Sequence, residues 1–174
     1  MSVRLETPRL RLREITPADA DFLLELMNEP GYLENIGDRG VRTLDDAARY
    51  IAERFLSSYA VEGWGLWCVE RRGEGERLGV CGLVRRDGLE HPDIGFAFLA
   101  RHGGQGFAIE SAQAVLGFAR DTLALPRLLG LVAPWNERSM RLLEKLGLRE
   151  IGRLRLAGAT RDSLLWATDL RRAD

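Results

Sequence analysis

Three glycines in four positions, Gly103, Gly104 and Gly106, separate a strand-like run from a helix-like run near the middle of the chain. The apolar run IGFAFL at residues 94–99 precedes them. Apolar residues spaced by three and four follow them, as on one face of a helix: Ile109, Ala112, Leu116, Ala119 and Leu123. The segment therefore requires a fold in which a buried strand, a loop of little bulk and the amino end of a long helix are consecutive.

Three interpretations of this loop are open from the residues alone. Glycine permits backbone angles that other residues avoid, so the segment fits an ordinary strand-to-helix turn. A dinucleotide-binding fingerprint fits poorly, because its third glycine would fall at Ile109 and because antiparallel strands precede the loop. In the third interpretation, the amides of His102 through Phe107 and the positive end of the helix dipole hold an anion such as a diphosphate.

The hydrophobic pattern of the rest of the chain predicts a mixed α/β fold in one domain, residues 1–174. Thr16 and Thr43 are typical helix caps, and the polar segment ENIGDRGVR at residues 34–42 is expected to be a loop. The expected order is β-α-α-β-β-β-α-β-α-β-β. Strands are expected at residues 10–13, Trp64–Glu70, Arg77–Arg85, Asp93–Leu99, 127–134, Leu148–Leu156 and Asp162–Thr168.

The charge balance excludes several classes of partner. The chain has 25 lysines and arginines against 26 acidic residues, which leaves no electrostatic footprint for nucleic acid or an anionic membrane. The opening MSVRLETPRLRLRE has no apolar run of the signal-peptide kind, and no run reaches the roughly 18 apolar residues of a membrane span. We therefore expect a cytoplasmic protein. Nothing in the pattern indicates its oligomeric state.

Cys68 and Cys81 lie in two strand-like runs that a hairpin turning at Glu74–Gly75 would bring together. In one register they face each other, and a slip by one residue places them on opposite faces. We expect both to be reduced thiols in the core. With two histidines, His91 and His102, and no Cys-x-x-Cys spacing, no metal site is expected.

Four segments, in the right order, resemble motifs of the GNAT superfamily of N-acetyltransferases, and in particular its ribosomal-protein N-terminal acetyltransferase (Rim-type) branch. They are LETPRLRLREITPADA near the start, LGVCGL at residues 78–83, IGFAFLARHGGQGFAIES at 94–111 and NERSMRLLEKLGL at 136–148. Within the third, Arg-x-x-Gly-x-Gly at residues 101–106 is similar to the acyl-CoA loop. The resemblance implies the GNAT fold, with a mixed, mostly antiparallel sheet that splays between its fourth and fifth strands to admit the pantetheine arm of acetyl-CoA.

The resemblance also implies roles for individual residues. Asn136 is similar to the residue that contacts pantetheine, and it also reads as a helix cap. Ser139 is similar to the serine near the thioester sulfur, and it also fits a first-turn position with no chemical task. Glu110 matches a common glutamate at the helix start, where the helix dipole alone explains it. The expected cofactor contacts are Phe98, Leu99, Ala100, Arg101, His102, Gly103, Gly104, Gln105, Gly106, Phe107, Asn136 and Ser139.

Two positions depart from the family pattern. Gly103 stands where many relatives carry an aromatic residue, and Leu143 stands where many superfamily members have a tyrosine that acts as general acid. Because a thiol of pKa about 8.5 leaves readily near neutral pH, a strong acid is dispensable. Expected catalytic residues are Ser139, Glu90 and Asp93, with His91 and Glu34 as further candidate bases. Glu34 and Asn35 are the expected acceptor contacts.

The cost of deprotonating the amine favours a weakly basic acceptor. At pH 7, freeing a lysine of pKa ~10.4 costs about 4.6 kcal/mol, against about 1.2 kcal/mol for an α-amine near 7.9. The expected function is therefore transfer of an acetyl group from acetyl-CoA to a primary amine, with a peptide or protein α-amine favoured, by direct attack in a ternary complex. The alternatives are a non-catalytic coenzyme A-binding regulator and an acetyltransferase for small molecules such as amino acids or antibiotics.

Overall fold

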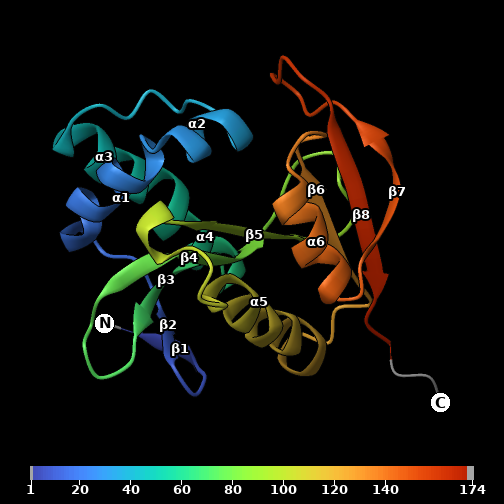
Figure 1. Ribbon diagram of the computed structural model, residues 1–174, viewed down its shortest axis with the longest axis horizontal. Helices are drawn as coiled ribbons and strands as arrows, with labels where there is room; N and C mark the ends of the chain where they lie inside the picture. The colour runs from blue at the N-terminus through green and yellow to red at the C-terminus, as the bar shows by residue number, and fades with distance from the viewer. Residues whose placement is uncertain (1, 172–174) are drawn as a thin grey trace.

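A computed structural model describes residues 2–171, and its centre is an eight-stranded sheet (Figure 1). The strands are β1 (Val3–Glu6), β2 (Leu10–Arg13), β3 (Leu66–Arg71), β4 (Arg77–Val84), β5 (Asp93–Phe98), β6 (Arg127–Val132), β7 (Arg149–Leu154) and β8 (Ser163–Asp169). Their order in the sheet is β1-β2-β3-β4-β5-β6-β8-β7. Neighbouring strands are antiparallel except β5 and β6, which run parallel. The expected mixed, mostly antiparallel sheet is confirmed.

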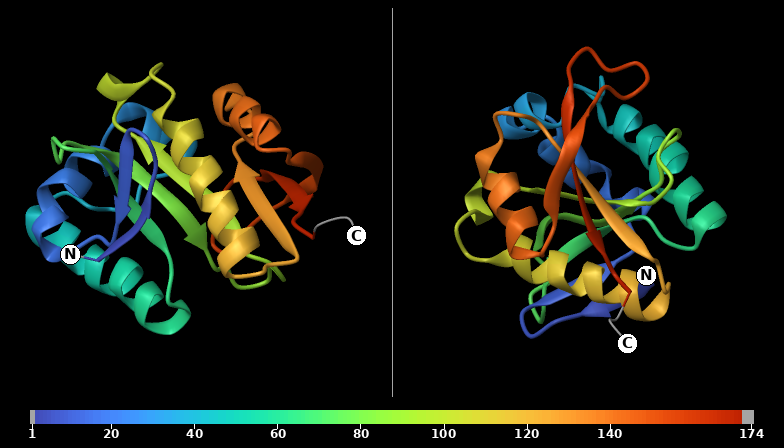
Figure 2. Two further views of the ribbon diagram at one scale, coloured as in Figure 1. Left: turned by 90° about the horizontal axis from the view of Figure 1, so that it is seen from below. Right: turned by 90° about the vertical axis from the view of Figure 1, so that its right-hand side faces the viewer.

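Helices cover both faces of this sheet (Figure 2). On one face, α1 (Ala20–Met27), α3 (Leu44–Tyr50) and the π-helical η2 (Ile51–Leu56) pack on Cys68, Val80 and Leu99. On the other face lie α5 (Phe107–Gly117), its π-helical continuation η4 (Phe118–Thr122) and α6 (Glu137–Lys145). The remaining helical segments are η1 (Pro17–Asp19), α2 (Pro30–Asn35), α4 (Ser57–Glu62) and η3 (Ala100–His102).

The sheet is split between its two parallel strands. Only Asp93 and Ile94 of β5 pair with β6, opposite Leu129 and Gly130. Beyond Ile94 the strands diverge, as Figure 1 shows for β5 and β6. Because the strands are parallel, the loops that follow both of them lie at the same, open end of the split. The helices that begin after these loops, α5 and α6, therefore start on either side of one opening.

Two elements differ from the sequence-based expectation. The edge strand β1 was not expected, and it pairs with β2 through mostly exposed residues. The segment at residues 34–42 was expected to be a loop, but Glu34 and Asn35 belong to α2. The first helix, α1, ends at Met27, and Pro30 occupies the first turn of α2, with Glu29 as the cap residue. Proline is tolerated there because that N–H has no helical partner.

The hairpin of β3 and β4 settles the register of the two cysteines. Cys68 pairs with Val80 and Cys81 pairs with Trp67, so the two thiols point to opposite faces of the sheet. Of the two registers considered from the sequence, the one shifted by a residue is therefore present. Both cysteines are buried and free of any disulfide.

Candidate active site

The glycine loop joins β5 to α5 at the open end of the split. Gly104 and Gly106 have φ angles of 74° and 81°, a left-handed conformation that favours glycine. Gly106 is the residue that caps α5, and its carbonyl accepts from the Glu110 amide at 3.1 Å. The amides of Phe107 and the next residues begin the helix and have no acceptor within it. The loop thus presents main-chain donors at the positive end of the α5 dipole.

The first residues of the loop use their amides internally. The amides of His102 and Gly103 donate to the carbonyls of Leu99 and Ala100, both at 3.0 Å, and close the η3 turn. The predicted row of open amides, His102 through Phe107, is therefore reduced to Gly104–Phe107. The side chains of this turn also lead away from the loop. His102 is buried, and its Nε2 atom lies 3.6 Å from Glu76. Arg101 forms an ion pair with Glu25 of α1.

Residues near the amino terminus brace the loop from outside, which the sequence did not reveal. Arg9 donates through Nη1 to the Gln105 carbonyl at 2.9 Å and through Nε to Glu110 at 2.6 Å. Thr7 Oγ1 also donates to Glu110, at 2.6 Å. Burial raises the pKa of Glu110, but these hydrogen bonds outweigh it and leave the pKa below its ordinary value. Glu110 is therefore an anchor for the loop as well as a first-turn acid.

The free edge of β5 faces the split. The Leu99 amide donates to the Leu78 carbonyl of the neighbouring β4 at 3.0 Å, whereas the Pro92 carbonyl accepts from Leu129 of β6 at 3.0 Å. Since main-chain groups alternate between the two sides of a strand, Phe96 and Phe98 turn theirs towards the split. The main-chain groups of Leu99 point away from the split, towards β4. The Ala100 amide is also engaged, because it donates to the Glu29 carboxylate at 2.8 Å. Of the expected cofactor contacts Phe98, Leu99 and Ala100, Phe98 is therefore the one whose main-chain groups face the split.

Asn136 and Ser139 lie together at the start of α6. Asn136 Oδ1 accepts from the Ser139 amide at 3.2 Å, and its Nδ2 donates to Ser139 Oγ at 2.9 Å. Asn136 is therefore a helix cap, as one of its two predicted roles requires. Leu143, one turn further, is buried against Gly130, so its side chain belongs to the core under α6.

Of the three carboxylates predicted as candidate bases, Asp93 is buried, whereas Glu90 and Glu34 are exposed. Asp93, at the closed end of the split, is 2% exposed and accepts from Arg86 Nε at 2.8 Å. Burial raises the pKa of Asp93, although the neighbouring Arg86 charge opposes this. The Glu90 side chain is 88% exposed, with Nε2 of His91 at 3.8 Å. Alternation along β5 places Asp93 on the same face as Leu99, which packs with α1 and α3.

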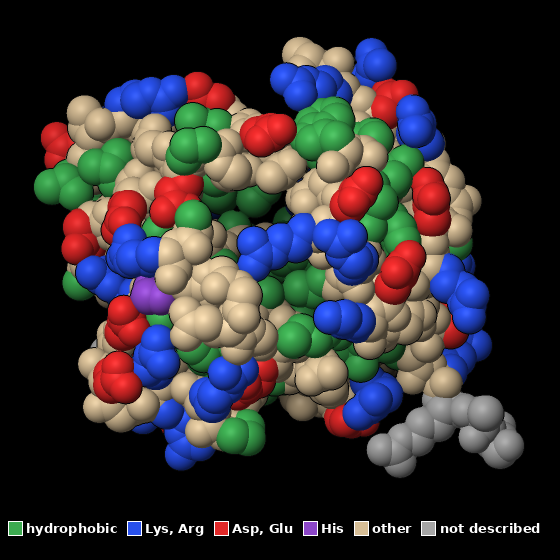
Figure 3. Space-filling model, in the orientation of Figure 1, with side chains coloured by type: hydrophobic (Ala, Val, Ile, Leu, Met, Phe, Trp, Pro, Cys, Tyr) green, Lys and Arg blue, Asp and Glu red, His purple; other side chains and the backbone are tan. Residues whose placement is uncertain are grey.

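The acceptor residues expected from the sequence, Glu34 and Asn35, lie on α2 above the split. Figure 3 shows the surface hollowed between this part of the molecule and α6, with basic side chains along the edge of the hollow. Tyr32 belongs to the same helix, and burial raises its pKa to about 12. Its phenol therefore stays protonated near neutral pH.

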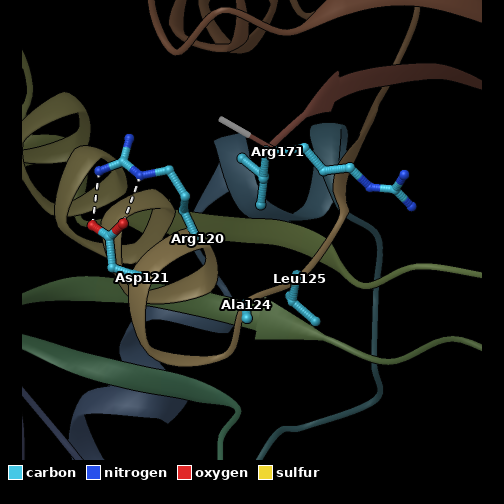
Figure 4. Close-up of a pocket in the computed structure, with 6 residues that line it drawn as sticks. Arg120, Asp121, Ala124, Leu125 and Arg171 are labelled. Atoms are coloured by element: carbon cyan, nitrogen blue, oxygen red, sulfur yellow. Dashed lines mark hydrogen bonds and ion pairs between the residues drawn. The ribbon is translucent and has the colours of Figure 1, made fainter. Parts of the chain in front are cut away.

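A separate open groove of about 440 Å³ lies at the far end of the α5–η4 helix (Figure 4). It is lined by Arg120, Asp121, Ala124, Leu125, Leu170 and Arg171. Arg120 and Asp121, neighbours in the chain, form an ion pair beside it. None of the expected site residues lines it, so it is distinct from the glycine loop and the split.

The chain matches the family model described as "Acetyltransferase (GNAT) domain" over residues 9–149. It belongs to the GNAT acetyltransferase family. This GNAT protein is 30% identical over 152 residues to the "Uncharacterized N-acetyltransferase YoaA" of Bacillus subtilis (strain 168), covering 87% of this chain and 85% of the relative. It is an N-acetyltransferase, and enzymes of this family use acetyl-CoA as the acetyl donor.

Solved structures share the fold of this GNAT enzyme. An acetyltransferase from Agrobacterium tumefaciens str. C58 superposes with a TM-score of 0.80 at 25% identity, covering 97% of this chain and 95% of that one. A ribosomal-protein-S5-alanine acetyltransferase from Vibrio fischeri superposes with a TM-score of 0.76 at 17% identity, covering 97% of each chain. At that identity the likeness concerns the fold alone.

Within residues 2–171, no group of three or more His, Cys, Asp or Glu side chains is arranged to hold a metal ion. Over the same residues, no helix has the length and apolar character that crossing a bilayer requires.

Proposed function

We propose that this GNAT enzyme acetylates a primary α-amine at the amino terminus of a peptide or protein, by direct attack of the amine in a ternary complex. The observation that carries the proposal is the buried Asp93 carboxylate at the closed end of the split. A carboxylate whose pKa is raised by burial is a better proton acceptor near neutral pH than an exposed one. The choice of an α-amine rests on the cost of freeing the nucleophile at pH 7, which is about 1.2 kcal/mol for an α-amine and about 4.6 kcal/mol for a lysine.

The donor side of the proposal rests on the loop and the split. The left-handed Gly104 and Gly106 leave the approach to the loop amides free of side chains, which fits a diphosphate. The free edge of β5 at Phe96 and Phe98 offers main-chain groups to the amides of a pantetheine arm. Acetyl-CoA, bound there, would supply an acyl thioester with a thiol leaving group.

In this proposal the residues of the chain mainly position and hold protons. Asp93 accepts the proton from the amine, and Arg86 orients its carboxylate. Asn136 and Ser139 lie on the opposite wall of the opening, at the start of α6. The Ser139 hydroxyl accepts from Asn136, which leaves its own proton free to donate toward the leaving sulfur. Asp93 is buried and paired with Arg86, whereas Glu90 is exposed. We therefore propose Asp93 as the base.

The acceptor is tested by comparing matched peptides. Purified enzyme and acetyl-CoA are mixed with peptides that carry a free α-amine, and with the same peptides blocked at the α-amine but containing lysine. The release of free thiol measures transfer. We expect turnover of the first set alone. Turnover of only the blocked, lysine-containing peptides, or only of amino acids or amino sugars, would show that the α-amine assignment is wrong.

We also propose that the enzyme acts in a reducing compartment such as the cytoplasm. Cys68 and Cys81 are both buried and both unpaired, which suits a compartment that keeps thiols reduced. Finding either cysteine in a disulfide in protein taken directly from cells would contradict this.

A further inference from the structure

The three glycines of the loop do not serve the same purpose. Gly104 and Gly106 have positive φ angles, but Gly103 has a φ of −67° and a ψ of 156°, which any residue adopts. Backbone freedom therefore does not explain Gly103. Its missing side chain makes room instead: a Cβ atom there would lie 3.1 Å from Nη2 and 3.4 Å from Nη1 of Arg138, and 3.2 Å from the Ala100 carbonyl oxygen.

Arg138 reaches the loop from the other half of the sheet. It belongs to the first turn of α6, directly after Glu137, which begins the helix that follows β6. The glycine loop follows β5, and β5 and β6 are parallel and diverge at this end. The Arg138 side chain therefore crosses the open end of the split and places its guanidinium beside Gly103, the residue that precedes the free amides of Gly104–Phe107.

This guanidinium has no counter-charge within the described part of the chain. Arg9 is paired with Glu110, and Arg101 is paired with Glu25. No hydrogen bond or ion pair joins Arg138 to any residue between 2 and 171. An exposed arginine beside the glycine loop, without a carboxylate partner, is suited to an anion that arrives from outside.

We propose that Arg138 is a ligand of the diphosphate of acetyl-CoA, held across the split by the space that Gly103 leaves. The inference rests on the proposed position of the donor in the glycine loop. The guanidinium fork supplies charge-assisted hydrogen bonds to the diphosphate, while the loop amides bind it from the side of β5. Binding of the donor then joins α6 to the loop and steadies the opening of the split.

Calorimetric titration of coenzyme A into wild-type enzyme and the variants Arg138→Ala and Arg138→Lys tests the proposal. Arg141→Ala is the matched control, because Arg141 is an exposed arginine of the same helix whose nearest carboxylate is Glu137. We expect Kd to rise roughly tenfold to hundredfold in Arg138→Ala, less in Arg138→Lys, and by less than about threefold in Arg141→Ala. Equal Kd values for Arg138→Ala and wild type would overturn the proposal for Arg138 alone. Failure of wild type to bind coenzyme A would instead overturn the proposed donor site.

Titration with 3′-dephospho-coenzyme A identifies the phosphate. If Arg138 binds the diphosphate, Arg138→Ala loses the same factor in affinity with and without the 3′-phosphate. A loss confined to coenzyme A that carries the 3′-phosphate would overturn the assignment.

The spatial role of Gly103 has its own test. Gly103→Leu can adopt the native backbone angles, but its Cβ atom would lie 3.1 Å from the Arg138 guanidinium and 3.2 Å from the Ala100 carbonyl oxygen. We expect it to weaken coenzyme A binding in the wild type and to have a much smaller effect in the Arg138→Ala background. An equal effect in both backgrounds would show that Gly103 acts independently of Arg138.

Discussion

Arg9 and Glu110 are separated by 101 positions in the chain, yet their side chains form an ion pair of 2.6 Å at the first turn of α5. The Arg9 guanidinium also lies 4.7 Å from the centre of the Phe107 ring and donates to the Gln105 carbonyl. Arg9, in the segment before β2, therefore contacts the glycine loop at Gln105, the start of α5 at Phe107, and Glu110 in the first turn of α5. The amino-terminal segment of this enzyme therefore supports the glycine loop.

Removing this pair is expected to weaken donor binding without unfolding the protein. Glu110→Gln keeps the shape of the side chain but removes the charge that holds Arg9. Because Arg9 is about half exposed, the pair contributes at most about 1 kcal/mol, and we expect Kd for coenzyme A to rise about twofold to fivefold. Calorimetry measures the change. Glu6→Gln, which removes the exposed Arg11–Glu6 pair on β1, is the control and should leave Kd unaltered.

The left-handed glycines should be sensitive to any side chain. Gly106→Ala places a Cβ atom at φ 81° and 3.2 Å from Arg9 Nη2, and we expect it to cost about 1–2 kcal/mol in stability. It should also weaken coenzyme A binding by roughly tenfold, since the loop amides shift. Gly73→Ala is the matched control: Gly73 has the same φ of 81°, in the β3–β4 turn with no atom near its Cβ position. It should lose similar stability and keep its affinity. Equal affinity losses in both variants would contradict the role of Gly106.

The sequence was sufficient to predict the order of the main elements, because each depends on local signals. Thr43 and Asp46 form the expected capping box, and Asn136 caps α6. The edge strand β1 and the short α2 were missed, because β1 is largely exposed and because Pro30 reads equally as a helix end and a helix start. The bracing of the loop by Thr7 and Arg9, and the reach of Arg138 to Gly103, depend on contacts between distant segments that no periodicity reports.

A buried charge network beneath η1 should control stability in acid. Arg13 donates to both oxygens of Asp19, at 2.8 and 2.9 Å, and to Glu70 at 2.7 Å. Burial raises the pKa of Asp19, but the hydrogen bonds from Arg13 and from the Thr16 amide outweigh it and hold the pKa below its ordinary value of 3.8. The ionised Asp19 therefore stabilises the fold above pH 3.8, and this contribution is lost as the pH falls through the lowered pKa.

Breaking this network should cost far more than breaking a surface pair. Arg13→Met leaves the buried Glu70 without its cation and Asp19 with Arg77 alone, at 3.4 Å, and we expect a loss of about 3–5 kcal/mol at pH 7. The difference in unfolding free energy from wild type should narrow as the pH falls, because protonation removes the carboxylate charges that Arg13 neutralises in the wild type. Urea unfolding at several pH values measures this. Arg4→Met, which removes the exposed Arg4–Glu14 pair, should cost less than about 1 kcal/mol. A pH-independent difference would contradict the account.

The two thiols should be inert in the folded enzyme. Burial raises the pKa of Cys68 to about 12 and that of Cys81 to about 12. Since the thiolate is the reactive form, neither should react with a thiol reagent at pH 8 while the protein is folded. In urea both should react. Rapid labelling of either cysteine in the native enzyme would show that its strand is more open than described here.

The assignment of Asp93 as the base predicts a specific pH dependence. The base must be ionised to accept a proton, so kcat/KM should fall on the acid side as the pH drops through the pKa of Asp93. Because burial raises that pKa, the fall should begin at a higher pH than an exposed aspartate would give. Asp93→Asn should lower kcat by roughly a hundredfold or more and remove the ionisation of Asp93 from the acid limb, leaving only that of the α-amine at about 7.9. Glu90→Gln tests the other predicted carboxylate and should do neither.

Substitution of Arg86 can distinguish a chemical role for Asp93 from a structural one. The Arg86 charge lowers the pKa of Asp93 against the effect of burial, so Arg86→Met should raise this pKa and move the acid limb to higher pH. Asp87→Asn, in the exposed loop one residue along, serves as the control and should leave the limb in place. If Arg86→Met reduces kcat/KM equally at every pH, Asp93 does not titrate in the reaction, and its pair with Arg86 supports only the closed end of the split.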